Sequence, residues 1–444
     1  MREFYLPSEF SGIDTSDPEF NKALEYILHT DYNIFINGPA GVGKSVLLRI
    51  AYRCLKGTVM VISSTGISAC HLVDQGIPAS TIHRGLYVKP QDIFSFFSLT
   101  ENELKGVDVL MGVDTLLIEE VGMVSACLFD EIGKLVSKAE RKRKKPIRVI
   151  CFGDVLQLPP VVKDEEKVSK VYQDRYKGNI FFFHSNFYRE HNFFLVSLNT
   201  IYRQSSESFQ NVLNRIRLGI PDSDDFNKIN RQKKPLEVFK KEHPLSLILA
   251  PTVKTVAMLN EQYGKPENSS RFGVFRAVTS GDYDWSDSGL VDRQVTLWEG
   301  QQVMCIHNKE SYYQNGTLGI VTRIYDDSVV VRKATGEEVL VEKHVWPQYV
   351  YDYDPSTGEV VAHESGKAVQ IGCKPATAST IHKAQGLTLD AVYLYLKDYW
   401  IPFSGIYLGL SRCRTLEGIG LSRNIVPSDI KVMDEPLDYV LESF

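Results

Sequence analysis

The stretch NIFINGPAGVGKSVLLR at residues 33–49 determines the fold class. A short apolar, β-prone run leads directly into GPAGVGKS at 38–45, which matches the phosphate-loop pattern G-x-x-x-x-G-K-[ST] in full. Glycines let backbone N–H groups turn towards a polyphosphate, and a helix expected from about Lys44 adds its positive dipole end. Lys44 is placed to reach the β and γ phosphates, and the Ser45 hydroxyl to bind Mg²⁺. The predicted nucleotide-binding residues of the loop are Gly38, Pro39, Ala40, Gly41, Val42, Gly43, Lys44 and Ser45.

Composition limits the class of protein. With 444 residues and 43% hydrophobic content, the chain predicts two or three domains with large cores. A net charge of −5 argues against a generally basic nucleic-acid coat protein, but it allows a local basic channel. Seven scattered cysteines without a C-x-x-C pair argue against a zinc ribbon or a disulfide framework. Because no apolar run has signal-peptide or membrane-spanning length, we expect a soluble cytoplasmic protein.

The first half of the chain alternates strand and helix patterns. An amphipathic helix is expected at 17–29, with Asp17 as its N-cap and Pro18 at its first position. Buried strands are expected at 57–63, 113–120 and 147–152, in addition to the strand before the phosphate loop. Helical segments join these four strands. The pattern therefore predicts a nucleotide-binding α/β half of roughly 200 residues.

Two of these strands end in polar residues that suit phosphate chemistry. Glu119 and Glu120 end an apolar strand, where phosphate-loop ATPases hold their metal and polarise the attacking water. Gln157 follows the strand at 147–152 and is a plausible sensor of the γ-phosphate. Surface charge at a strand end and an amide that satisfies local backbone remain the alternative interpretations.

Other polar and aromatic groups stay ambiguous at this point. Thr65 and His83 follow strand patterns, so they could touch substrate or simply tie down loops. The segment at 84–107 is an insertion whose Phe94, Phe96 and Phe97 could stack on bases, although a small local core is favoured for any single ring. The basic run KAERKRKK at 138–145 is expected to be a solvated face.

The second half repeats the α/β theme around a β-rich segment. A strand and then a helix are expected within 192–219, and the strand at 245–250 leads into Thr252. Hairpin and turn signals at 315, 335 and 357 indicate a β module at about 295–372, after which the α/β pattern resumes. Arg203 and Arg412 lie on either side of this module, and together they suit neutralisation of phosphate charge from a second domain.

Taken in order, these motifs resemble those of superfamily 1 DNA helicases of the Pif-one and Dda type. The matching segments are GPAGVGKS at 38–45, STG at 64–66, TIH at 81–83, IEEVGMV at 118–124, FGDVLQLPP at 152–160, IYRQ at 201–204, TIHKAQGLT at 380–388 and YLGLSRCRT at 407–415. They span nearly the whole chain. TIHKAQG and GDxxQLPP are much more specific than the phosphate loop alone.

The resemblance implies two RecA-like motor domains, at 1–200 and 201–444, with a small β wedge inserted at about 84–107 and a small β-barrel-like module at about 295–372. It implies a monomer that hydrolyses ATP with Mg²⁺, translocates 5′ to 3′ on single-stranded DNA, unwinds duplexes at single-strand junctions, and serves repair, recombination or replication. The implied catalytic residues are Lys44, Glu120, Gln157, Arg203 and Arg412, with Gly386 also at the nucleotide and Ser45 and Glu119 at the metal. The implied DNA contacts are Thr65, Gly66, His83, Phe97, Thr252, Thr380, His382, Lys383 and Gln385.

The chain departs from the family pattern in three respects. Glu119 stands where the family has Asp, Gly122 stands where it has Ser, and Phe20 and Asn21 occupy the region where members often place a Gln that reads adenine. The departures at Glu119 and Gly122 keep an ATP-gated DNA clamp with weak hydrolysis as one alternative to the helicase. The other alternative is a translocase that remodels protein–DNA complexes. The preferred DNA structure, whether fork, R-loop or G-quadruplex, also stays open.

Overall fold

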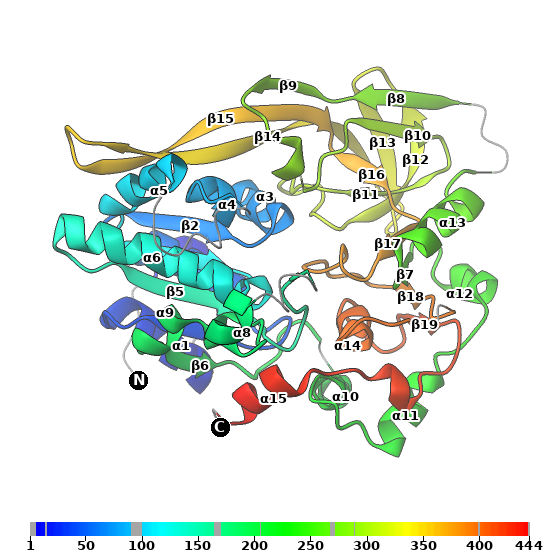
Figure 1. Cartoon of the computed structure of the whole chain (residues 1–444). Helices are drawn as coiled ribbons and strands as arrows, with labels where there is room; N and C mark the ends of the chain where they lie inside the picture. Colours follow the sequence, from blue (N-terminus) through cyan, green and yellow to red (C-terminus); the bar gives the residue numbers. More distant parts are fainter. Residues whose placement is uncertain are drawn as a thin grey trace.

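The computed structural model describes residues 6–13, 16–89, 100–163, 170–204, 206–266, 271–287, 289–397 and 400–442. In this part of the chain, a six-stranded and a four-stranded parallel sheet lie beside each other, and antiparallel strands cover one end of both (Figure 1). We name the two parallel sheets with their helices the first and second α/β units, and strands β8 to β16 the β module. The mixed α/β class predicted from the sequence is confirmed.

The first α/β unit is built on the six-stranded sheet. Its strands, in spatial order, are β3 (Ala79–Thr81), β2 (Val59–Ser63), β4 (Thr115–Glu119), β5 (Arg148–Gly153), β1 (Ile34–Asn37) and β6 (Phe194–Ser197). All neighbouring strands pair in parallel. The four strands predicted in the nucleotide-binding half are β1, β2, β4 and β5. Because parallel strands share a direction, their carboxyl ends line one edge of the sheet.

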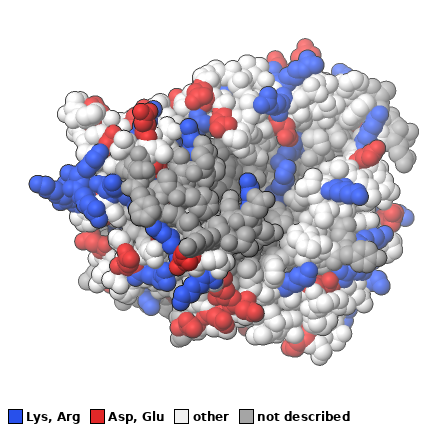
Figure 2. Space-filling model, in the orientation of Figure 1, with Lys and Arg blue, Asp and Glu red and all other residues white. Residues whose placement is uncertain are grey.

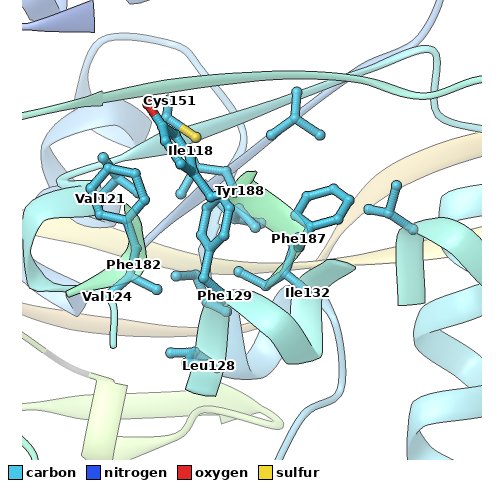
Figure 3. Close-up of a cluster of buried hydrophobic side chains, with 14 of the residues drawn as sticks. Ile118, Val121, Val124, Leu128, Phe129, Ile132, Cys151, Phe182, Phe187 and Tyr188 are labelled. Carbon is cyan, nitrogen blue, oxygen red and sulfur yellow. The ribbon is translucent and has the colours of Figure 1, made fainter. Parts of the chain in front are cut away.

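Alternate residues of these strands face opposite layers of helices. Ile34 and Ile36 of β1 belong to the core that contains α1 (Pro18–His29) and α2 (Lys44–Cys54). Phe35 belongs to the core on the other face, with α5 (Glu101–Met111) and α6 (Ala126–Arg143). Figure 3 shows this second core, where Phe129 and Ile132 of α6 meet Phe182, Phe187 and Tyr188.

Shorter helices complete the first unit. They are η1 (Ser8–Phe10), α3 (Gly66–Asp74), α4 (Ile82–Gly85), η3 (Val121–Met123), α8 (Lys170–Tyr176), η4 (Phe182–His184) and α9 (Asn186–Glu190). The predicted start of α1 is confirmed, since the Asp17 side chain accepts a hydrogen bond from Phe20 N at 2.7 Å and Pro18 opens the helix. The expected strand–loop–helix around the phosphate loop is likewise present as β1 and α2.

The second α/β unit has a four-stranded parallel sheet in the order β17 (Ala378–Thr380), β7 (Leu247–Ala250), β18 (Val392–Leu394) and β19 (Ile419–Leu421). Its helices are α10 (Glu207–Arg217), α11 (Ser223–Asn230), α12 (Leu236–Glu242), α13 (Val253–Tyr263), α14 (Gly405–Leu410) and η6 (Pro427–Asp429). The last helix, α15 (Asp434–Leu441), returns to the first unit, where Tyr439 stacks on Phe183 with ring centroids 4.1 Å apart.

The β module lies in the chain between α13 and β17. Its strands are β8 (Phe272–Arg276), β9 (Val278–Gly281), β10 (Gln294–Trp298), β11 (Gln302–Cys305), β12 (Leu318–Ile324), β13 (Ser328–Lys333), β14 (Glu338–Asp354), β15 (Glu359–Ile371) and β16 (Cys373–Pro375), with η5 (Trp285–Asp287) among them. The strands thus extend beyond the expected 295–372 at both ends. Gly316, Gly336 and Gly358 have positive φ at the three predicted turn signals, as a turn glycine requires.

A long ribbon formed by β14 and β15 reaches over the first α/β unit (Figure 1). Tyr351 of this ribbon is only 4% exposed and belongs to the core of the first unit. Its hydroxyl donates to Pro78 O at 2.5 Å and accepts from Val61 N at 3.3 Å. The ribbon therefore anchors the β module to the first α/β unit.

The predicted insertion at 84–107 can be followed only at its ends. Residues 90–99, with Phe94, Phe96 and Phe97, lie outside the described residues. The described flanks are the end of α4 and most of the first two turns of α5, which begins after a capping box at Thr100. In the described ranges, none of the helices combines the length and the apolar character needed to cross a bilayer.

Candidate functional site

A cleft of about 890 Å³ lies between the two α/β units. From the first unit it is lined by Ala40, Gly41, Gly43, Lys44, Ser45, Thr65, Glu119, Glu120 and Gln157, among others. From the second unit it is lined by Tyr202, Arg203, His382, Lys383, Gln385, Gly386 and Arg412, among others. Most residues predicted for nucleotide chemistry, although far apart in the sequence, therefore share one cavity.

The phosphate loop has the backbone geometry that its glycines predict. Gly41 and Gly43 have φ values of 88° and 91°, which side-chain-bearing residues rarely adopt. Lys44 lies at the start of α2, and its Nζ donates to Gly38 O at 2.7 Å and to Pro39 O at 3.0 Å. Burial lowers the pKa of Lys44, while neighbouring carboxylates oppose that shift. The ammonium is thus held at the loop, next to where phosphates would bind.

Three residues of the phosphate loop support its structure but do not line the cleft. Gly38 and Pro39 supply the carbonyl groups that accept from Lys44. Val42 is 1% exposed, and its side chain lies in the core beneath the loop. The loop backbone also meets the second unit, because Ala40 N donates to the Tyr407 hydroxyl at 3.0 Å.

The two carboxylates at the end of β4 occupy different positions. Glu119 Oε1 accepts from Ser45 Oγ at 3.4 Å, whereas Glu119 Oε2 is buried without a hydrogen-bond partner. Burial and the adjacent Glu120 raise the pKa of Glu119 to about 8. A hydroxyl and an unsatisfied carboxylate oxygen side by side are ligands that Mg²⁺ prefers, so this pair fits the metal implied by the sequence. Glu120 has a left-handed φ of 54°, which turns its chain direction at the cleft.

Gln157 lies at the junction of the two units. Its Nε2 donates to Asp154 Oδ2 at 3.0 Å, and its Oε1 accepts from Gln385 Nε2 at 3.3 Å. Gln385 also hydrogen-bonds the Glu120 side chain and lowers its pKa, although burial dominates and raises that pKa overall. Because the Gln157 amide contacts both α/β units, a structural change on one side of the cleft can be transmitted through it to the other side.

The two predicted arginines come from the second unit. Arg412 is 1% exposed, and it donates to Leu408 O at 3.1 Å and to Ser411 Oγ at 2.9 Å. Arg203 donates to Ser411 O at 3.4 Å, and its Cβ lies only 2.6 Å from where a side chain on Gly41 would begin. Burial and the nearby Arg203 lower the pKa of Arg412 to about 9. A buried cation at Arg412 and a half-buried one at Arg203 suit an anionic ligand in the cleft.

The predicted DNA contacts divide into two groups. Thr65, His382, Lys383 and Gln385 line the cleft, and Gly66 lines a small pocket beside it. Thr65, Thr252 and Thr380 also accept hydrogen bonds from Ser68 N, Thr255 N and Lys383 N respectively, so each hydroxyl has a local structural role. His83 lies on α4. Phe97 lies outside the described residues.

Sequence reasoning missed the groups that join the two walls. Asp154 and Arg217 form an ion pair at 2.8 Å, and both are almost fully buried. Asp154 lies within the quoted FGDVLQLPP segment, but its partner could not be found, because Arg217 reads as an ordinary cation in the last turn of an amphipathic helix. Tyr407 lies in the YLGLSRCRT segment, but nothing in the sequence predicted that its hydroxyl contacts the phosphate loop.

The structure shows the surroundings of two residues that depart from the family pattern, Gly122 and Phe20. A Cβ on Gly122 would lie 2.6 Å from Asp154 O, so the close approach of two backbones requires glycine there. The Phe20 ring lies against Gly43 and lines the cleft where an adenine-reading Gln was expected.

The basic run forms the end of α6, visible as a blue group at the left edge of Figure 2. Three of its cations are paired, namely Lys142 with Asp108, and Arg143 and Lys145 with Asp114. Most residues of the run are exposed, in agreement with the solvated face predicted for it, and the ion pairs are an additional finding.

Comparison with known proteins identifies the family. The family model of PIF1-like helicases matches residues 19–226. The ATP-dependent DNA helicase Pif1 of Campylobacter jejuni is 26% identical over 420 residues, which cover 88% of each chain. Human ATP-dependent DNA helicase PIF1 is 27% identical over 93% of this chain and 62% of its own length.

Solved structures agree over nearly the whole chain. Bacteroides Pif1 in complex with ADP-AlF4 superposes with a TM-score of 0.84 at 28% identity, covering 97% of both chains. Bacteroides Pif1 bound to single-stranded DNA superposes with a TM-score of 0.64 at 27% identity, covering 96% of both. The arrangement of this chain is therefore nearer to the first of these structures, and the two parallel sheets are RecA-like domains. Over residues 19–226 the chain matches the PIF1-like helicases, and over nearly its whole length it is similar to Pif1 helicases.

Proposed function

We propose that this protein is an ATP-dependent DNA helicase that translocates 5′ to 3′ on single-stranded DNA and opens duplexes at single-strand junctions. The observation that carries the proposal is the cleft itself. Its first wall holds the phosphate loop and the Glu119–Glu120 pair, and its second wall holds Arg203 and Arg412. Hydrolysis sites built in this way couple ATP turnover to closure between two domains.

The role of each residue follows from its position. Backbone N–H groups of the loop and the Lys44 ammonium bind the phosphates. Ser45 and Glu119 hold Mg²⁺, which when bound neutralises charge on the phosphate oxygens. Glu120 accepts a proton from the attacking water. Arg203 and Arg412 supply positive charge from the second unit as charge develops on the γ-phosphate.

Gln157 and Gln385 connect this chemistry to the DNA. Their side chains touch across the cleft, so loss of the γ-phosphate changes the contact between the two walls. Thr65, His382 and Lys383 border the same cleft and contact the DNA backbone in this proposal. Support comes from relatives, since Bacteroides Pif1 has been solved bound to single-stranded DNA, and another similar structure concerns DNA unwinding at forked duplex DNA by two coordinating Pif1 helicases.

The domain arrangement proposed for this activity follows the sequence prediction. Motor domains extend over about 1–200 and 201–444, with a wedge at about 84–107 that splits the duplex and a barrel-like module around 295–372. The antiparallel strands β8 to β16 support the module, and the wedge rests on the resemblance. We expect a monomer that uses ATP and Mg²⁺.

Tailed duplexes test the proposal most directly. ATP hydrolysis is measured with and without single-stranded DNA, and unwinding is then followed on duplexes with a 5′ or a 3′ tail. We expect strong stimulation by DNA and unwinding from 5′ tails. Lys44→Ala should abolish both activities, whereas the exposed Lys56→Ala is the matched control. No stimulation by DNA would reject the helicase, and unwinding only from 3′ tails would reject the polarity.

A DNA clamp with weak hydrolysis is the second candidate. It is favoured by Glu119, whose raised pKa of about 8 leaves the carboxyl largely protonated at neutral pH before a metal arrives. Phosphate release over many turnovers distinguishes the two, because a clamp would stop after about one ATP per chain. A translocase that remodels protein–DNA complexes would hydrolyse ATP repeatedly but fail to separate a protein-free fork.

A further inference from the structure

We infer that Asp74, His307 and His344 form a binding site for a divalent transition-metal ion of the Zn²⁺ type, which fastens the β module to the first α/β unit. Asp74 ends α3 of the first unit, His307 follows β11, and His344 lies on β14. One ligand atom from each residue lies within 4.8 Å of the other two. The site is separate from the ATP cleft, which none of the three residues lines.

The three side chains are already gathered for coordination. The imidazole rings of His307 and His344 stack with centroids 3.9 Å apart and planes 12° apart, and His344 Nε2 lies 3.9 Å from Asp74 Oδ1. Tetrahedral ligands at about 2.0–2.1 Å from Zn²⁺ are separated by roughly 3.4 Å, so ligand atoms that now lie up to 4.8 Å apart must approach by as much as about 1.4 Å. Because imidazole lone pairs lie in the ring plane, one ring must also turn out of the parallel stack. The His344 side chain is 32% exposed, which leaves room for the ring to turn.

A second layer of hydrogen bonds orients two of the ligands. His307 Nδ1 lies 3.0 Å from Asn308 O, and because a carbonyl only accepts, Nδ1 carries the proton and Nε2 the lone pair. The Tyr313 hydroxyl now donates to that Nε2 at 3.0 Å, and the metal would replace this single hydrogen bond. Asp74 Oδ2 accepts from Asn308 N at 2.9 Å and from Asn308 Nδ2 at 2.5 Å, which leaves Oδ1 for the metal. Metal ligands are commonly oriented in this way.

The chemistry of the three ligands selects the class of metal. Two imidazoles with one carboxylate suit Zn²⁺, Co²⁺ or Ni²⁺ and disfavour Mg²⁺, which prefers oxygen. The alternative is a metal-free packing contact between the first α/β unit and the β module.

Metal titration of the full chain decides between these two possibilities. Protein freed of metal with EDTA is titrated with Co²⁺ and Zn²⁺ in excess Mg²⁺, and binding is measured by equilibrium dialysis and the Co²⁺ visible spectrum. We expect one ion per chain, nitrogen and oxygen ligation without a thiolate charge-transfer band, and a higher Tm with Zn²⁺. His344→Gln and Asp74→Asn should each weaken binding at least tenfold, whereas His363→Gln, on the same ribbon beside Asp352, should leave it unchanged.

Several results would overturn the inference. They are no stoichiometric binding to the parent chain, a thiolate band that places the ion on cysteine, or an affinity in both variants equal to that of the parent chain. Each variant is first compared with the parent in EDTA by circular dichroism and Tm. Asp74 lies in the first α/β unit and His344 in the β module, so if one variant fails to fold, the metal affinity of the other still tests the site. The Co²⁺ spectrum of the parent chain tests the site without either variant.

Discussion

Arg217 of the second α/β unit donates to Asp154 of the first, with Nη2 2.8 Å from Oδ1 and Nε 3.3 Å from Oδ2. Both side chains are at most 5% exposed, so this two-pronged ion pair crosses the domain interface out of water. Burial alone would raise the pKa of Asp154, but the Arg217 guanidinium holds it below its ordinary value. The pair therefore connects the loop of Gln157 to α10 whenever Asp154 is ionised.

Removing one partner of this pair should destabilise the protein strongly. We expect Arg217→Gln to lower the free energy of unfolding by about 3 kcal/mol, because Asp154 would remain buried as an unpaired charge. Denaturant unfolding measures the change, and the exposed pair of Arg323 with Glu338 gives the control, since Arg323→Gln should change the free energy of unfolding far less. Adding Asp154→Asn to Arg217→Gln should recover part of the loss. Equal effects of Arg217→Gln and Arg323→Gln would contradict the assigned role.

The pH dependence of this pair has a definite sign. Since the folded pKa of Asp154 is depressed, its contribution to stability is present above the unfolded pKa and is lost as pH falls through the folded value. The difference in stability between the parent and the Asp154→Asn variant should therefore shrink at acid pH, below about 4.

Binding of Mg²⁺ with nucleotide should depend on pH through Glu119. Its raised pKa of about 8 means that the carboxyl must lose a proton to bind the metal. The affinity for Mg²⁺–nucleotide should rise with pH up to about 8, by as much as about tenfold per unit, and binding should release close to one proton at pH 7. Calorimetry in two buffers of different ionisation enthalpy counts that proton. In Glu119→Gln the pH dependence should disappear together with much of the Mg²⁺ requirement.

The same raised pKa affects stability in the opposite sense from Asp154. A carboxyl whose folded pKa lies above its unfolded pKa contributes most at low pH, and that contribution is lost as pH rises towards about 8. Glu119→Gln should therefore stabilise the nucleotide-free protein more at pH 8 than at pH 5. A constant difference across this range would show that Glu119 titrates normally.

Local patterns predicted one wall of the cleft well. The phosphate loop, the carboxylates of β4 and Gln157 follow strands whose apolar character is continuous, so their common edge could be predicted from topology alone. The contacts between the two walls of the cleft could not be predicted in this way. These contacts join residues that lie 63 to 367 positions apart in the sequence, and they are made by Arg217, Tyr407 and Gln385. A local hydrophobic pattern gives no information on pairs so far apart. The second wall was placed at Arg203 and Arg412 by paired cations and by resemblance.

Gly122 illustrates a departure that spacing alone could not explain. A side chain at 122 would begin 2.6 Å from Asp154 O, where two backbone segments meet. We expect Gly122→Ser to destabilise the protein by about 1–3 kcal/mol, because the Asp154 loop must shift to admit the side chain. Gly12→Ser is the control for stability, since among the described residues, apart from its chain neighbours, no atom lies within 4 Å of a Cβ placed there. An unchanged unfolding midpoint in Gly122→Ser would show that the loop yields at little cost.

Gln385 should couple DNA to hydrolysis more than it supports hydrolysis itself. Its amide touches Gln157 and the Glu120 side chain from the opposite wall. Gln385→Ala should lower the ATPase rate with single-stranded DNA by about tenfold, the effect of roughly 1.4 kcal/mol at the transition state, and lower the DNA-free rate less. Steady-state assays at saturating ATP measure both rates. Equal losses with and without DNA would assign Gln385 to catalysis alone.

Glu120→Gln separates binding from cleavage. The substitution preserves size and the hydrogen bond with Gln385 but removes the group that accepts a proton from water, so we expect turnover to fall by at least about a hundredfold. Nucleotide affinity should stay within a few-fold of the parent, because Lys44 and the loop are unchanged. Fluorescent ATP binding and phosphate release measure the two quantities on the same sample. The exposed Glu190→Gln should leave both as in the parent chain, and a Glu120→Gln variant with normal turnover would transfer the role of base to another group, of which Glu119 is the nearest along the chain.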